Sequence, residues 1–121
     1  MDANNALAAA TDGGHLEIVK YLVGRGANRL NEALVAAAQG GQLEIVKFLV
    51  ENGADKMNDA MLQAAYGGRL ETAKYLVGHG ANRLNKAMEL AEYNSHLKTV
   101  KYLIVFLILC FFLSPVYLPR G

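Results

Sequence analysis

One motif recurs at a fixed interval along this chain, and the interval constrains the fold more than any other feature. The copies "GGHLEIVKYLV", "GGQLEIVKFLV" and "GGRLETAKYLV" begin at Gly13, Gly40 and Gly67, so the period is 27 residues. A weaker fourth copy, "NSHLKTVKYLI", begins at Asn94. About 27 residues cannot close a hydrophobic core alone, so each unit must bury its apolar face on its neighbours. The period therefore predicts a stacked array of repeats.

Each unit reads as two short helices joined by a tight turn. In the second unit, Asn31 precedes "EALVAAAQ", a run of good helix formers, and we expect its side chain to cap that first helix. After Gly40-Gly41, "QLEIVKFLV" has the spacing of an amphipathic second helix, with Glu44 and Lys47 paired on its outer face. Gly53, like Gly26 and Gly80, stands where a left-handed C-terminal cap is expected. The sequence thus predicts a repeated αα-hairpin.

These residues carry a family resemblance. The pattern "AA..GG.LEIVK.LV..GA[ND]" is similar to the helical part of an ankyrin repeat. The resemblance implies an all-α solenoid of stacked helix-turn-helix units that binds proteins through its variable positions. The usual repeat has about 33 residues, so six are missing where the family has its β-turn finger, and the T-P-L-H stretch is replaced by "EALV" and its equivalents. Such shortened copies resemble arrays found in giant viruses and protists. We expect an ankyrin-like array lacking the β-turn fingers.

The period also sets expected boundaries. We place an ankyrin-like array at residues 4–104, with units at about 4–30, 31–57, 58–84 and 85–104, and an apolar tail at 105–121. Three good units are near the minimum for an array, and neither end shows an evident polar cap.

Composition and motifs disfavour several classes of function. Twelve Lys and Arg against eleven Asp and Glu give a net charge of +1 without any block of like charge, which argues against nucleic-acid binding. The three histidines are scattered along the sequence and lack neighbouring ligands, so we expect no metal site. No phosphate-cradling or nucleophile motif occurs, so we also expect no cofactor, no small-molecule substrate and no enzymatic activity. The single Cys110 and the absence of a secretory signal favour a cytoplasmic protein.

Candidate partner-binding residues are those that vary between otherwise matching units, on the exposed face of the first helices and in the turns. Residues that vary on a constant frame are typical of a recognition surface. They are equally typical of a solvated surface whose sequence is not constrained. Tyr66 is the best single anchor, because tyrosine combines a large contact area with few rotors and a polar tip. The candidates are Asp12, Gln39, Gln63, Tyr66, Arg69 and Tyr93.

The tail departs from the pattern of the units. Residues 102–118 form a run of seventeen without a charge, and a helix of that length spans about 26 Å, just short of the ~30 Å hydrocarbon core. Three interpretations stay open: a membrane anchor, a capping helix that covers the last unit, and an array cut short by truncation or frame change. The candidate membrane segment is marked by Tyr102, Phe106, Phe111 and Leu118.

The sequence therefore favours a non-catalytic protein-binding module, with the partner's identity left open. Two alternatives are a membrane-tethered scaffold, anchored by the C-terminal segment, and a truncated member of a repeat family that has no dedicated partner.

Overall fold

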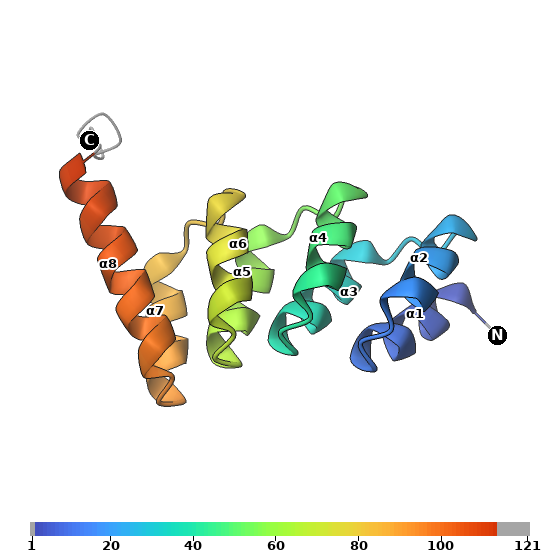
Figure 1. Ribbon diagram of the computed structural model, residues 1–121, viewed down its shortest axis with the longest axis horizontal. Coiled ribbons are helices and arrows are strands. Elements are labelled where there is room, and N and C mark those ends of the chain that lie inside the picture. The colour runs from blue at the N-terminus through green and yellow to red at the C-terminus, as the bar shows by residue number, and fades with distance from the viewer. Residues whose placement is uncertain (1, 114–121) are drawn as a thin grey trace.

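The computed structural model describes residues 2–113, with side chains as far as residue 109, and this part of the chain is an array of eight α-helices (Figure 1). Consecutive helices pair into four antiparallel hairpins, and the hairpins stack side by side along the long axis of the molecule (Figure 1). The expected all-α solenoid of stacked helix-turn-helix units is confirmed. The helices are α1 (Ala3–Asp12), α2 (Leu16–Gly24), α3 (Leu30–Gln39), α4 (Leu43–Glu51), α5 (Met57–Tyr66), α6 (Leu70–Gly78), α7 (Leu84–Tyr93) and α8 (Leu97–Leu113).

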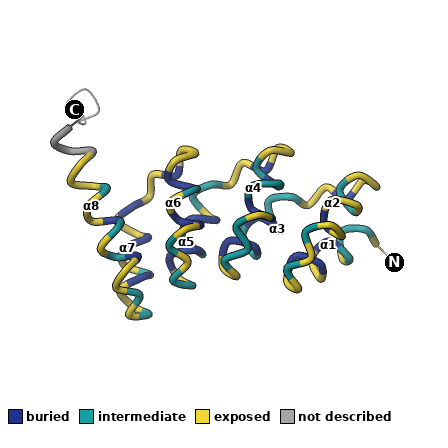
Figure 2. The backbone as a smooth tube through the Cα atoms, viewed as in Figure 1, coloured by how far each residue is buried: buried dark blue, intermediate teal, exposed yellow. Residues whose placement is uncertain are grey.

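The core is a continuous layer between and within the hairpins (Figure 2). First helices pack on one another more extensively than second helices do, because their contact faces are built largely from alanine, which lets two backbones approach closely. Each hairpin adds larger side chains from the same positions of the repeat. The fully buried large residues include Leu7, Leu34, Met61, Val19, Val46, Leu49, Leu76 and Leu103.

The paired glycines make the turn inside each hairpin. Gly40 and Gly67 end the first helices with ordinary helical φ values of −80° and −83°, whereas Gly41 and Gly68 both have φ of +70°. That left-handed conformation is easy only for glycine. Gly67 is further constrained by its neighbour, since a Cβ there would lie 2.5 Å from the backbone oxygen of Gln39 in the preceding unit. Gly41 and Gly68 are thus needed for the turn itself, and Gly67 is needed for the close stacking of the second and third units.

The expected caps at the ends of the second helices are confirmed. Gly26, Gly53 and Gly80 have φ of +103°, +108° and +107°. In the first unit the Ala27 amide donates to the Leu22 carbonyl at 3.0 Å, which closes the last turn.

The prediction that Asn31 caps the first helix is wrong. Helix α3 begins one residue earlier, at Leu30, and no side chain caps it. Instead the Asn31 Oδ1 accepts hydrogen bonds from the backbone amides of Asp55 and Lys56, at 2.8 and 3.1 Å, in the loop that leads to the next unit. Asn31 therefore ties the first helix of the second unit to the loop that leads into α5, the first helix of the third unit.

The same bond recurs at the period of the repeat. Asn4 accepts from the amides of Asn28 and Arg29, and Asn58 accepts from those of Asn82 and Arg83, all at 2.8 to 3.1 Å. These asparagines form a ladder along one edge of the array.

Helix α8 is longer than the other second helices and continues past Ile104 to Leu113. Among the described residues, no helix combines the length and the hydropathy needed to cross a membrane. Tyr102 and Phe106 lie half-buried on α8 with ring centroids 6.1 Å apart, and the backbone of Phe111 is helical. Leu118, the last marker of the candidate membrane segment, lies outside the described residues.

Candidate functional site

Four of the six candidate partner-binding residues share one position of the repeat, and they form a row along the edge where the hairpin turns lie. Asp12, Gln39, Tyr66 and Tyr93 are the last residues of α1, α3, α5 and α7, and all four are exposed. The four turns that follow these residues lie along the same edge of the array (Figure 1). We call these four residues the turn-edge row. Because each sits at the same place in a stacked unit, the structure brings together residues that are 27 apart in the sequence.

The two tyrosines make the row apolar toward its C-terminal end. Tyr66 is 42% exposed and Tyr93 is 83% exposed. Neither is needed to fill the core, since the buried positions of α5 and α7 are occupied by other residues. Gln63 is half-buried on α5, one helical turn before Tyr66, and Leu90 is half-buried at the equivalent position of α7. The exposed surface at this end therefore combines aromatic, apolar and amide groups.

Arg69 is exposed, but the structure also gives it a contact between units. Its Nε donates to the Gln39 carbonyl oxygen at 3.0 Å. Its side chain also covers Gly41, where a Cβ would lie 2.7 Å from the Arg69 Cδ. Gln42 covers Gly14 and His96 covers Gly68 in the same way. The repeat position shared by Gln42, Arg69 and His96 thus contacts the turn of the preceding unit. Sequence variation at this position does not reveal that structural role.

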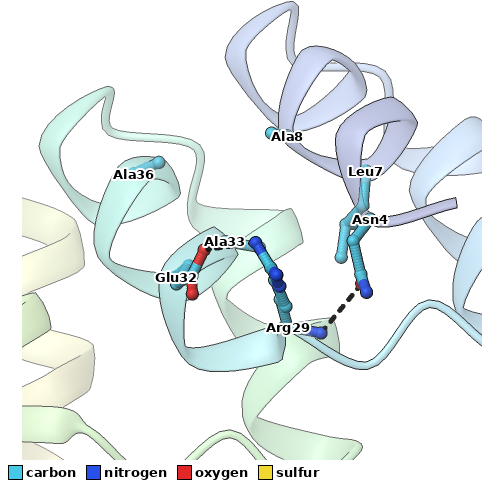
Figure 3. A pocket seen from close by; sticks show the side chains of 7 residues that line it. All are labelled: Asn4, Leu7, Ala8, Arg29, Glu32, Ala33 and Ala36. Atoms are coloured by element: carbon cyan, nitrogen blue, oxygen red, sulfur yellow. Dashed lines mark hydrogen bonds and ion pairs between the residues drawn. The ribbon is translucent and has the colours of Figure 1, made fainter. Parts of the chain in front are cut away.

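A shallow hollow between α1 and α3 was not expected from the sequence (Figure 3). Its volume is about 50 Å³, far below the roughly 300 Å³ of an ordinary ligand pocket. The hydrogen bond from the Arg29 amide to the Asn4 Oδ1, 3.0 Å long, lies at its edge (Figure 3). Asn4, Leu7, Ala8, Arg29, Glu32, Ala33 and Ala36 line the hollow.

The second helices carry paired charges and packed aromatic residues. The expected pair of the second unit is confirmed, with a distance of 3.6 Å from the Lys47 Nζ to the Glu44 Oε1. Lys74 and Glu71 form the equivalent pair of the third unit, at 3.5 Å. Burial, with a smaller contribution from the Glu51 carboxylate, raises the pKa of the Tyr75 hydroxyl above its usual value. Throughout the described part of the chain, no three His, Cys, Asp or Glu side chains gather closely enough to hold a metal ion.

Hairpins stacked in register around a shared core define this molecule as an α-solenoid repeat protein. A family model described as ankyrin repeats (3 copies) matches residues 1–60, and the repeat continues in the same register beyond them. The chain belongs to the ankyrin-repeat family. No protein in the curated set matches it significantly. Ankyrin repeats generally act as protein–protein interaction modules, and the family is typically non-catalytic.

Proposed function

We propose that this protein binds a partner protein along the turn-edge row and the neighbouring exposed face of the first helices. The observation that carries the proposal is the exposure of Tyr66 and Tyr93 at the ends of adjacent first helices, on a surface that no described part of the chain covers. Tyrosines of this kind dominate the energy of many protein interfaces, since they bury a large area at low cost in rotamer entropy.

The frame around these side chains supports this use. The turn after Tyr66 is fixed by Gly67 and Gly68, and Arg69 bonds back to the Gln39 carbonyl in the preceding unit. A rigid frame presents a side chain without a further loss of backbone entropy on binding. The absence of fingers from the repeat leaves the helix ends and turns as the natural recognition surface.

Crosslinking from two positions tests the proposal. A photo-crosslinking amino acid replaces Tyr66 in one variant and Glu71, an exposed residue of α6, in the matched control. We expect a partner to be captured from position 66 and not from position 71. With that partner purified, Tyr66→Ala should weaken binding about tenfold or more, as expected for a hot-spot tyrosine.

Two results would contradict the proposal. One is a partner captured equally well from both positions. The other is an unchanged Kd for the Tyr66→Ala variant. If no protein is captured specifically from position 66, the interpretation as a repeat-family member without a dedicated partner is favoured instead.

A second candidate is a scaffold tethered at a membrane through α8. The observation in its favour is that Val105, Leu107, Ile108 and Leu109 are all exposed apolar residues of that helix. We expect the full chain to stay with cell membranes through an alkaline wash, and the double variant Leu107→Lys, Leu109→Lys to be released. If the unmodified chain is also released by the wash, the tether is ruled out.

A further inference from the structure

Contacts between successive units repeat at the spacing of the array, and two of them are specific. In the first, an asparagine of one unit accepts from two amides of the following loop, as Asn31 does from Asp55 and Lys56. In the second, a lysine of one second helix lies over an aromatic ring of the next. The Lys47 Nζ is 6.0 Å from the Tyr75 ring centroid, and an equivalent contact follows in the next unit. Each unit thus has a face that contacts the unit before it and another that contacts the unit after it.

The first unit exposes the face that the other units turn toward their predecessor. Ile18 is 51% exposed, whereas the residues at the same position of the next three units, Ile45, Thr72 and Thr99, are 2%, 2% and 1% exposed. Tyr21 is 62% exposed, with the Arg25 guanidinium 5.8 Å from its ring centroid. Its equivalents in the later units are all half-buried. We call Ile18 and Tyr21 the leading face.

The fourth unit exposes the opposite face. Leu97 is 64% exposed and Ile104 is 42% exposed, whereas their equivalents in the first three units are half-buried or buried. Asn85 stands where Asn31 does, yet within the described residues it has no loop amides to bind. Lys101 stands where Lys47 does, and Lys98 replaces the glutamate that pairs with that lysine in the other units. We call Leu97, Ile104, Asn85 and Lys101 the trailing face.

We propose that the leading face of one molecule docks on the trailing face of a second copy of this chain. The two faces lie at opposite ends of the array (Figure 1), and each is one half of an interface that the molecule already forms three times internally. In this arrangement Ile18 occupies the place of Ile45, and the Tyr21 ring lies under Lys101 as Tyr75 lies under Lys47. Such a head-to-tail contact does not close on two copies, so association continues into short linear oligomers.

One residue of the fourth unit opposes this association and limits its strength. Glu92 is exposed, but the residues at its position in the first three units, Thr11, Ala38 and Ala65, are buried. Stacking a further unit would move the Glu92 carboxylate out of water, which is unfavourable for an unpaired charge. Glu92→Ala restores the residue of the second and third units, and it should therefore strengthen association about tenfold or more.

Sedimentation velocity over a range of concentrations tests the proposal with the full chain. We expect the unmodified protein to form linear oligomers that grow with concentration. Ile18→Glu and Ile104→Glu each remove one face, and each variant alone should be monomeric. Because both side chains are substantially exposed, the fold should survive, as helical circular dichroism would verify. Mixed in equal amounts, the two variants should form a dimer, since each retains the face that the other lacks.

The matched control is Val105→Glu on α8. Val105 is 52% exposed, but its equivalents are exposed in every unit, and the second unit has Glu51 there. This variant should associate like the unmodified protein. The proposal fails if the unmodified chain is monomeric at all concentrations, if Ile18→Glu still oligomerises, or if the mixed variants stay monomeric. Loss of association in Val105→Glu alone would instead assign the contact to the outer surface of α8.

Discussion

The substitution Asn31→Ala tests the central structural finding, that the repeated asparagine joins units and does not cap helices. The alanine removes three hydrogen bonds. The Asn31 Oδ1 no longer accepts from the Asp55 and Lys56 amides, at 2.8 and 3.1 Å, and its Nδ2 no longer donates to the Asp55 carboxylate at 3.1 Å. The two amides belong to the loop between α4 and α5. Loss of these hydrogen bonds therefore loosens the connection between the second and third units.

The magnitude follows from the exposure of these groups. A typical net hydrogen bond contributes about 0.5–1.5 kcal/mol, and these bonds lie at the lower end because water can replace the lost oxygen. Three such bonds amount to roughly 2 kcal/mol. Alanine has a higher helix propensity than asparagine, and at the second position of α3 this stabilises the variant by about 0.5 kcal/mol. We therefore expect the free energy of unfolding to fall by about 1.5 kcal/mol.

Asn85→Ala is the matched control. Asn85 occupies the same position of α7, but no loop amides bind it within the described residues. We expect its replacement to leave the stability unchanged within about 0.5 kcal/mol. Urea denaturation gives both values, and hydrogen exchange should show lost protection of the Asp55 and Lys56 amides in Asn31→Ala alone. If the asparagine were a helix cap, both substitutions would cost about 1 kcal/mol, and the loop amides would keep their protection. That result would refute the reasoning.

Three further predictions concern the turns, the core and pH. Gly67→Ala should lower the free energy of unfolding by about 1–3 kcal/mol in urea denaturation, because the new Cβ meets the backbone oxygen of Gln39. Gly40 stands at the same position of the second unit and has no such contact, so Gly40→Ala should be neutral or slightly stabilising. Leu34→Ala should lower the free energy of unfolding by about 3 kcal/mol, measured in the same way, because that side chain is fully buried. The raised pKa of Tyr75 means that above about pH 10 the unfolded chain loses the hydroxyl proton before the folded one does. Stability should therefore decline as pH rises past that value, and denaturation of Tyr75→Phe should show a smaller decline.

The order of the helices could be predicted from the sequence because its causes are local and repeated. Three features recur in every complete copy, and each acts within a few residues. They are the paired glycines, the apolar spacing of the second helix, and the glycine after that helix at residues 26, 53 and 80. The role of Asn31 could not be predicted in this way. An asparagine before a helical run has the same appearance whether its oxygen binds the amides of its own helix or amides 24 and 25 residues away.

The candidate site shows the same limit. The exposure of Tyr66 and Tyr93 follows from their place at the end of an amphipathic helix, so both could be singled out from the sequence. Arg69 could not be separated from them. Its contact with the Gln39 carbonyl depends on how far one unit is displaced from the next, and that displacement is set by alanine packing between first helices.

The length of α8 has a local cause that separates the fourth unit from the others. The first three second helices are followed by a glycine with φ above +100° at residues 26, 53 and 80, and the corresponding residue of the fourth unit is Leu107. A leucine adopts that conformation only with strain, so the chain has no ready way to turn back and the helix continues. The fourth unit also places Ser95, with φ of 60°, where the others have glycine. The fourth unit thus has a strained serine in the turn between α7 and α8, and it lacks the glycine that ends the second helix in the other units. The continuation of α8 therefore follows from one missing glycine, whatever use the exposed apolar residues beyond it serve.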